Sequence, residues 1–256
     1  MKTALITGAS SGIGYELAKI HAEKGGNLVL VARNKAKLDE LKVELEKQFN
    51  VSVYTIGKDL SVLDAALEVF NETTEKGIQV DYLINNAGFG EYGMFSETSW
   101  EKEHQMINLN ITALTQLSKL YLKDMLKRKS GKIMNVASTA AFVPGPTMAV
   151  YCATKPYVLS FSEALDNEVR EFGVTVTALC PGATESGFMA AASAENSSLF
   201  KGKKLPSSKE VAEYGYNAML KGKPVAIHGF INQALAFFVR LMPRKLVVKV
   251  SRKVIQ

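Results

Sequence analysis

Residues 7–14 read Thr7-Gly8-Ala9-Ser10-Ser11-Gly12-Ile13-Gly14 and join a short apolar run to a longer amphipathic one. Glycine has no Cβ, so a turn with three glycines bends tightly and lets the backbone approach a ligand closely. The helix expected after the turn directs its free N–H groups and the positive end of its dipole toward that ligand. The stretch therefore predicts a strand–turn–helix unit that holds the phosphates of a dinucleotide.

Short β-branched runs and longer amphipathic runs alternate along most of the chain. We expect strands at Ala4–Thr7, Leu28–Val31, Val51–Ile56, Tyr82–Ile84, Lys132–Val136, Val174–Leu179 and Val225–His228. We expect helices at Gly14–Glu23, Lys35–Gln48, Leu63–Lys76, Glu101–Lys127 and Tyr151–Phe172. This alternation predicts α/β architecture, a doubly wound parallel sheet of about seven strands in a single domain. Residues 183–206 lack a sustained period and are expected to form a mobile loop.

The basic residues in excess of the acidic ones lie at one end of the chain. The 256 residues include 31 basic and 25 acidic ones, a net charge of +6. Residues 229–256 hold six basic residues and no acidic one, which leaves 25 basic residues to match the 25 acidic ones. A neutral body argues against nucleic acid as a partner. We expect residues 1–230 to bind the dinucleotide and catalyse, and residues 231–256 to extend the same domain.

The sequence lacks the features of membrane-spanning, secreted, disulfide-rich and metal-binding proteins. No run approaches the roughly 20 apolar residues of a membrane-spanning helix, and no signal peptide is recognisable at the N-terminus. Cys152 and Cys180 are the two cysteines, too few for a disulfide framework, so a cytoplasmic protein with reduced thiols is expected. His21, His104 and His228 share no ligand spacing, and no metal site is expected.

The end of the second expected strand indicates which dinucleotide is bound. Folds that bind NAD usually place an acidic residue there, to accept the ribose hydroxyls. Here the strand runs into Arg33, and the first acidic residue is Asp39, inside the next helix. A guanidinium offers a 2′-phosphate a charged, bidentate partner, whereas a carboxylate repels it. The sequence therefore favours NADP(H).

Tyr151 and Lys155 lie four residues apart in an expected helix, so their side chains share one face. A phenol titrates near pH 10, too high for proton transfer at neutral pH. An ammonium about 4 Å away contributes on the order of 4 kcal/mol, enough to lower the phenol pKa by about two to three units. We expect Lys155 to make Tyr151 a proton donor and acceptor in this way.

Several motifs now stand in one order: the glycine turn, Asn85-Asn86-Ala87-Gly88, Ser138, the Tyr151/Lys155 pair and Pro181-Gly182. In that order and spacing they resemble the short-chain dehydrogenase/reductase family, over roughly residues 1–230. The resemblance implies a Rossmann-like fold and an oxidoreductase that interconverts a carbonyl and an alcohol by hydride transfer. It also implies a homodimer or homotetramer built through the helices at 110–126 and 151–172.

The resemblance implies roles at matching positions. Tyr151 would be the general acid/base, Ser138 would hydrogen-bond the substrate oxygen, and Lys155 would lower the tyrosine pKa and bind the nicotinamide ribose. Asn110, or less well Asn108, would hold a water of the proton relay. The catalytic set is thus Asn110, Ser138, Tyr151 and Lys155. The cofactor-binding set is Thr7, Gly8, Ser10, Ser11, Gly12, Ile13, Gly14, Arg33, Asp59, Leu60, Asn86, Ala87, Gly88, Tyr151, Lys155, Pro181, Gly182 and Thr184.

The substrate stays open at this stage between a 3-oxoacyl thioester, a hydroxysteroid-like alcohol and a small ketone or aldehyde. A different class of function is a non-catalytic NADP-binding sensor or scaffold.

The contact made by the C-terminal segment also stays open: Ile231–Met242 and Arg244–Ile255 are amphipathic and separated by Pro243. They are expected to pack against the protein, with an anionic membrane surface as the alternative contact for residues 231–256.

Overall fold

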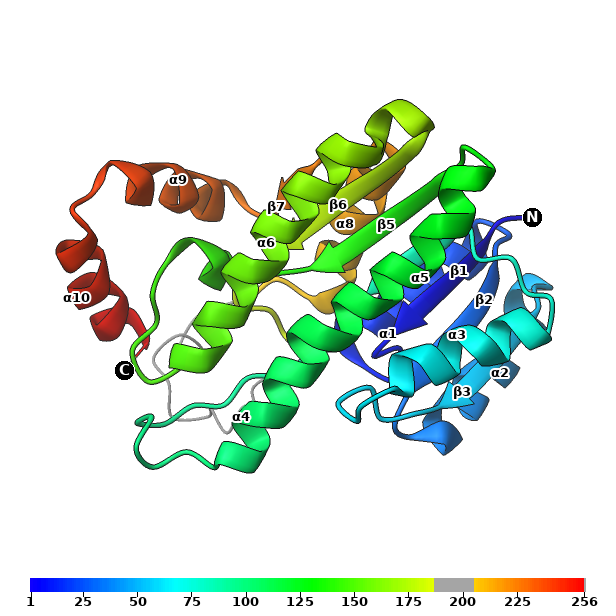
Figure 1. Ribbon diagram of the computed structural model, residues 1–256, viewed down its shortest axis with the longest axis horizontal. Helices are drawn as coiled ribbons and strands as arrows, with labels where there is room; N and C mark the ends of the chain where they lie inside the picture. The colour runs from blue at the N-terminus through cyan, green and yellow to red at the C-terminus, as the bar shows by residue number, and fades with distance from the viewer. Residues whose placement is uncertain (187–204, 256) are drawn as a thin grey trace.

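Seven parallel strands form one sheet in the computed structural model, which describes residues 1–186 and 205–255. The strands are β1 (Thr3–Thr7), β2 (Asn27–Ala32), β3 (Val53–Gly57), β4 (Tyr82–Asn85), β5 (Gly131–Val136), β6 (Val174–Cys180) and β7 (Val225–Ile227). Their order is β3-β2-β1-β4-β5-β6-β7 (Figure 1). From β1 the chain adds strands first on one side, as β2 and β3, and then on the other side, beginning with β4. The boundary between β1 and β4 is therefore the switch point of the sheet, and ligands of such sheets bind at the carboxyl ends of the strands beside it.

Helices cover both faces of the sheet. They are α1 (Gly12–Glu23), α2 (Lys35–Phe49), α3 (Ala65–Glu75), α4 (Trp100–Ile107), α5 (Leu114–Lys127), α6 (Ala149–Val169), α8 (Ser208–Leu220), α9 (Phe230–Phe238) and α10 (Arg244–Ile255). Short turns are the π-helical η1 (Asn108–Ala113) and the 3₁₀ turns η2 (Thr139–Phe142), η3 (Arg170–Phe172) and η4 (Val239–Leu241). The predicted doubly wound α/β fold is confirmed.

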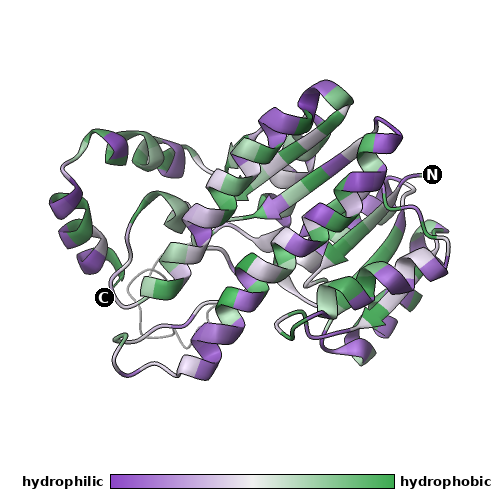
Figure 2. Ribbon diagram, in the orientation of Figure 1, coloured by the Kyte–Doolittle hydropathy of each residue, from purple (hydrophilic) through white to green (hydrophobic). Residues whose placement is uncertain are grey.

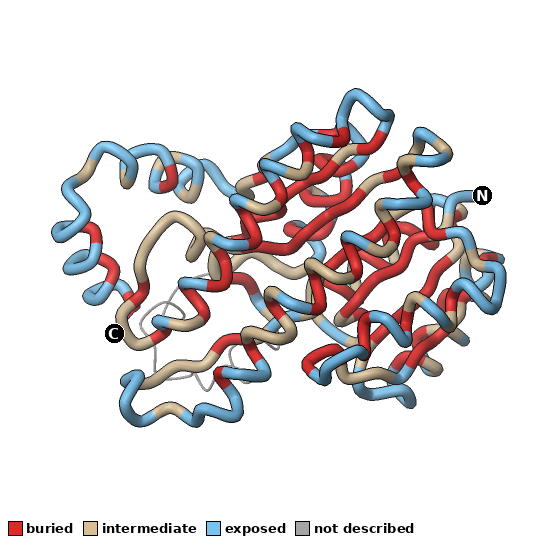
Figure 3. The backbone as a smooth tube through the Cα atoms, in the orientation of Figure 1, coloured by how far each residue is buried: buried red, intermediate tan, exposed pale blue. Residues whose placement is uncertain are grey.

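The strands are predominantly apolar because both faces of the sheet are covered. Successive side chains point to opposite faces, so Ile6 packs toward α1, α2 and α8, while Leu5 packs toward α3 and α5. Both side chains are fully buried. Figure 3 shows the strands buried along their length between partly exposed helices. This rigid core holds the carboxyl ends of β1, β4, β5 and β6 together.

Two elements differ from the sequence prediction. Helix α8 was not predicted, although Ser207 and Glu210 form a capping box at its start and Tyr216 is buried along it. The single helix expected over Glu101–Lys127 is α4 and α5 joined by the π-helical turn η1. Of the loop expected at 183–206, residues 187–204 lie outside the described part of the chain. Among the described residues, no helix is both long and apolar enough to cross a membrane.

Candidate active site

The glycine turn lies at the carboxyl end of β1 and enters α1. Gly8 and Gly12 have φ values of +66° and +57°, which residues with a side chain rarely adopt. A Cβ on Gly14 would lie 2.3 Å from the Gly8 carbonyl oxygen and 2.4 Å from the Asn86 amide nitrogen. The residues between them, Ser10, Ser11 and Ile13, are not fully buried. The chain therefore needs glycine here to fold the turn against the end of β4.

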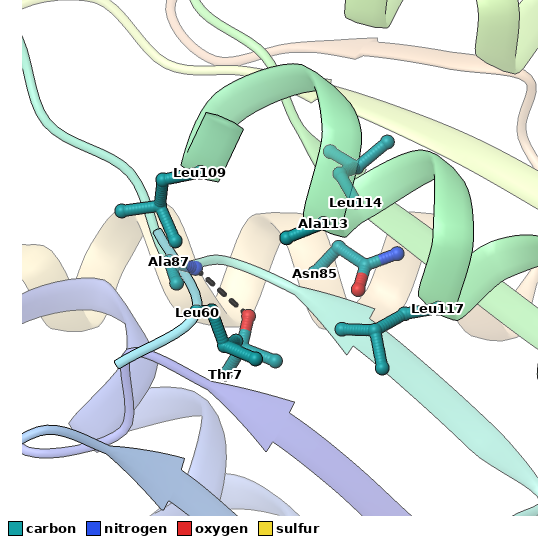
Figure 4. Close-up of a pocket in the computed structure, with 8 residues that line it drawn as sticks. All are labelled: Thr7, Leu60, Asn85, Ala87, Leu109, Ala113, Leu114 and Leu117. Carbon is teal, nitrogen blue, oxygen red and sulfur yellow. Dashed lines mark hydrogen bonds between the residues drawn. The ribbon is translucent and has the colours of Figure 1, made fainter. Parts of the chain in front are cut away.

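Thr7 and Asn86 tie the glycine turn to the strand beside it. The Thr7 Oγ1 accepts hydrogen bonds from the Asn86 and Ala87 N–H groups at 3.0 and 2.9 Å, the second of which Figure 4 marks. The Asn86 Nδ2 donates to the Thr7 and Gly8 carbonyls at 3.0 and 3.2 Å. These bonds fix the two loops at the switch point of the sheet.

A small pocket opens directly beside this junction. Its lining is Thr7, Leu60, Asn85, Ala87, Leu109, Ala113, Leu114 and Leu117 (Figure 4). Thr7, Leu60 and Ala87 belong to the predicted cofactor-binding set, whereas the sequence assigned no site role to the other five. Asn85 is buried and donates to Ser118 and Asn135, so it links β4 to α5 and β5. Its place inside the double-asparagine motif is the signal that points to it.

The ends of β2 and β3 carry the other predicted adenosine contacts. Arg33 directly follows β2 and is exposed. Asp39 faces away from this edge, because it accepts hydrogen bonds from the Lys35 ammonium and the Thr55 hydroxyl. Asp59 follows β3, and its carboxylate accepts from the Ser61 N–H and hydroxyl at 2.9 and 2.7 Å. The exposed charge at the end of β2 is therefore positive.

Ser138, Tyr151 and Lys155 come together at the carboxyl end of β5. The Ser138 hydroxyl lies beside the Tyr151 phenol and lowers its pKa. The Lys155 Nζ lies 5.5 Å from the centre of the Tyr151 ring and donates to the Val136 carbonyl at 2.9 Å. Tyr151 and Lys155 are both buried, one turn apart on α6. The pair that the sequence places on one helix face thus meets the serine that follows β5.

Asn110 reaches the same group from the π-helical turn η1. Its Nδ2 donates to the Phe89 carbonyl and the Thr154 hydroxyl, both at 3.1 Å, and its Oδ1 accepts from the Phe89 N–H at 3.3 Å. A Cβ on Gly88 would lie 2.9 Å from the Asn110 Oδ1 and 3.6 Å from the Lys155 Nζ. Gly88, Asn110 and Lys155 are therefore immediate neighbours. Asn108, the alternative relay residue, lies near His104 instead.

Burial governs the ionisation of the two catalytic candidates on α6. It raises the pKa of the Tyr151 phenol above its ordinary value, and the neighbouring Ser138 hydroxyl opposes this rise. It lowers the pKa of the Lys155 ammonium to about 8. The sequence predicted a lowered phenol pKa, whereas the pKa of Tyr151 in this structure is raised, because removal of the phenol from water is the largest effect on it. At neutral pH the phenol is protonated and the lysine is still charged.

Pro181, Gly182 and Thr184 follow β6 and form the opposite edge of the site. The Pro181 carbonyl accepts from the Thr139 N–H at 2.8 Å, and the Thr184 hydroxyl donates to the Gly182 carbonyl at 2.9 Å. A Cβ on Gly182 would lie 2.6 Å from the Asn232 Nδ2 of α9. The sequence did not single out Asn232, because only the folded chain brings the C-terminal segment to this loop.

An apolar cluster surrounds Tyr151 on the side away from the sheet. Its buried members are Met106, Met148, Tyr151, Cys152 and Ile255, and the partly buried Phe89, Tyr92, Ala140 and Val150 pack against them. Ile255 comes from α10, and its Cδ1 would lie 3.1 Å from a Cβ on Gly145. The last turn of α10 is thus part of the surroundings of the candidate acid.

Together, a glycine turn at the switch point and a serine beside a buried tyrosine–lysine pair define a dinucleotide-binding oxidoreductase on a doubly wound sheet. The model of the short chain dehydrogenase family matches residues 2–197 of the chain. The chain therefore belongs to the short-chain dehydrogenase/reductase family of oxidoreductases.

Relatives and solved structures agree with this assignment. The very-long-chain 3-oxoacyl-CoA reductase of Homo sapiens is 33% identical over 182 residues, which are 70% of this chain and 58% of that protein. The chain thus spans less than two thirds of that relative. A short-chain dehydrogenase from Sphingobium yanoikuyae in complex with NADPH has a TM-score of 0.84 at 31% identity and covers 94% of both chains. The bulky-bulky ketone specific alcohol dehydrogenase from Comamonas testosteroni has a TM-score of 0.79 at 30% identity, with 95% of this chain and 96% of that one covered.

Proposed function

We propose that the protein is an NADP(H)-dependent oxidoreductase that interconverts a ketone or aldehyde and the corresponding alcohol, with Tyr151 as the general acid/base. The observation that carries the proposal is the convergence of Ser138 and Lys155 on the buried Tyr151, with the Lys155 ammonium 5.5 Å from the centre of the phenol ring. Two hydroxyls that converge on one point suit the recognition of a single substrate oxygen.

The residues of the site divide the chemistry between them. When bound, NADPH supplies the hydride. Ser138 and Tyr151 hydrogen-bond the substrate oxygen, and the phenol, which burial keeps protonated, gives its proton as negative charge develops there. The Lys155 ammonium, 5.5 Å from the centre of the phenol ring, stabilises the resulting phenolate. Asn110 holds the loop at Phe89 beside this group.

The glycine turn and Arg33 fit a dinucleotide with a 2′-phosphate. Gly8 and Gly12 allow the positive φ values of the turn, and α1 begins at Gly12, so its N–H groups suit a pyrophosphate. Arg33 suits the 2′-phosphate, while Asp39 is held elsewhere by Lys35 and Thr55. The NADPH bound in the Sphingobium yanoikuyae structure supports the same preference.

We propose a substrate with a bulky apolar group next to its carbonyl. The cluster of Met106, Met148, Cys152 and Ile255 beside Tyr151 favours such a group over a small polar carbonyl compound. The ketone preference stated for the Comamonas testosteroni enzyme, and the acyl substrate named for the human relative, support this class. A 3-oxoacyl thioester and a hydroxysteroid both belong to it.

The test is Tyr151→Phe, which removes the acidic hydroxyl and keeps the ring. With a panel of bulky and small ketones, we expect turnover, followed by NADPH absorbance, to fall by about 10²- to 10⁴-fold. NADPH affinity is expected to stay nearly unchanged, because the phenol acts mainly in the transition state. Tyr157→Phe is the matched control, since Tyr157 is a more exposed tyrosine of the same helix.

Near-normal turnover by Tyr151→Phe would show that another group is the acid. Wild-type protein that binds NADPH but reduces none of the panel would instead support the alternative, a non-catalytic NADP-binding sensor or scaffold.

A further inference from the structure

The C-terminal helices α9 and α10 project beyond the carboxyl end of the sheet, as Figure 1 shows. In α9 the single buried side chain is that of Ala236. In α10, Val247, Ser251 and Ile255 are buried, four residues apart, so one stripe of this helix faces the protein. The Ser251 hydroxyl donates to the Pro144 carbonyl, and Ile255 lies in the cluster around Tyr151. These inner contacts anchor the helix pair next to the candidate active site.

The opposite side of α9 and η4 is apolar and exposed. We call it the outer apolar face; it consists of Phe230, Ile231, Leu235, Phe237, Phe238 and Leu241. Their side chains are exposed by 57% (Leu235) to 83% (Phe230). At 100° per residue the six positions fall within an arc of about 160°, and Ala236 lies on the opposite side of the helix. Figure 2 shows α9 as largely hydrophobic.

Such a surface points to an apolar partner. Soluble proteins rarely expose a contiguous apolar area of this kind unless something binds it. Three of the six residues are phenylalanines, and aromatic side chains suit the boundary between lipid headgroups and acyl chains. Since α9 has nine residues and α10 has twelve, either helix is too short to span a bilayer and would lie in its plane.

The charges of η4 and α10 identify the partner further. Arg240, Arg244, Lys245, Lys249, Arg252 and Lys253 are all exposed, and residues 229–255 contain no acidic side chain. A twofold contact would bring the same patch of two chains together and so place cations against cations. An anionic lipid surface instead accepts both the apolar side chains and the charges.

We propose that α9, η4 and α10 form a docking surface for an anionic lipid bilayer, in which the outer apolar face enters the headgroup region and the exposed cations of η4 and α10 contact acidic headgroups. Docking in this way holds the end of the molecule with Ile255 and Tyr151 toward the lipid. The proposal concerns binding alone and does not depend on which carbonyl compound is reduced.

The test is co-sedimentation of the full chain with vesicles of phosphatidylcholine, with and without phosphatidylserine. We expect at least about tenfold tighter binding to the anionic vesicles, weakened by salt. The double substitution Phe237→Ser/Phe238→Ser is expected to lower that binding at least about tenfold, and Lys245→Glu/Lys249→Glu to abolish the preference for phosphatidylserine. The matched controls are Leu63→Ser, at an exposed position just before α3, and Lys127→Glu, at an exposed position at the end of α5. Both should bind like the wild type.

Melting temperature and oligomer mass are measured for every variant, and the serine variants are expected to melt like the wild type because they lose exposed side chains. Failure of the wild type to bind either vesicle would overturn the proposal. So would vesicle binding that the phenylalanine substitutions leave unchanged, since charge alone would then explain it. A fall in oligomer mass in Phe237→Ser/Phe238→Ser, without vesicle binding by the wild type, would assign the outer apolar face to a second copy of the chain.

Discussion

Lys155 is a residue at which burial and charge oppose each other. Its pKa falls from 10.5 to about 8 because it is buried. Between about pH 8 and pH 10 the unfolded chain therefore binds more protons at this lysine than the folded chain does. The free energy of unfolding should then rise with pH in that window, by up to about 1.4 kcal/mol per pH unit from this residue. Below pH 8 both states are protonated, and the lysine gives no slope.

We predict that Lys155→Met loses this rise. Chemical denaturation of the wild type and the variant at a series of pH values below 10 measures how the free energy of unfolding changes with pH in each protein. The raised pKa of Tyr151 affects both proteins, and only above that range. The same slope in both proteins would show that Lys155 is not titrating in this window. Lys119→Met, a substitution of a lysine on α5, is the control and should keep the wild-type slope.

Arg33 carries the second prediction at the residue scale. We expect the wild type to favour NADPH over NADH by at least about tenfold in kcat/KM, and Arg33→Asp to abolish or reverse that preference, because a carboxylate repels the 2′-phosphate. Lys37→Asp, an exposed change in the first turn of α2, should leave the preference in place. Steady-state kinetics with both cofactors decide the matter. Equal use of the two cofactors by the wild type would show that Arg33 is a solvent-exposed residue that does not select the 2′-phosphate.

At the scale of elements, the π-helical turn between α4 and α5 places Asn110. A π turn adds a residue to the helix and is frequent at functional sites. Here it turns Asn110 inward, where it is 1% exposed and hydrogen-bonded to Phe89 and Thr154.

Helix α6 continues through Pro156. The bond lost at that proline is local, and the packing of α6 on the sheet keeps the helix whole.

Helix α10 gives a prediction at the same scale. Deletion of residues 244–256 removes the buried side chains of Val247, Ser251 and Ile255 and uncovers the cluster around Tyr151. We expect the melting temperature to fall by several degrees, because losing a large buried apolar side chain lowers the free energy of unfolding by up to about 5 kcal/mol. Lys245→Ala/Lys249→Ala/Lys253→Ala, which keeps the helix, is expected to melt like the wild type. Unchanged melting after the deletion would show that α10 contributes nothing to the stability of the body.

For the whole molecule, two aspects of assembly stay proposals. The homodimer or homotetramer implied by the family resemblance would use the outer sides of α5 and α6, where Tyr157 stacks on Phe161 and pairs with Thr115. This surface is separate from the outer apolar face, so oligomer mass and vesicle binding can be measured independently in the same variants.

The sequence by itself determined the doubly wound sheet and proposed the residues of the candidate site. Short apolar runs such as Leu28–Val31, the glycine turn, the double asparagine and the Tyr151/Lys155 spacing are local patterns. Local patterns are readable because the residues that cause them are neighbours in the chain. The bounds of the seven strands, predicted from such runs, agree with the structure to within two residues at either end.

The tertiary structure alone decided how these parts meet. The pocket beside Thr7, the inward turn of Asn110, the contact of Asn232 with Gly182 and the place of Ile255 beside Tyr151 all join residues far apart in the chain. It also decided the ionisation of the site: burial raises the pKa of Tyr151 and lowers that of Lys155, whereas the spacing of the two residues alone favoured a lowered phenol pKa. Burial is a property of the packed whole, and a spacing of four residues contains no information about it.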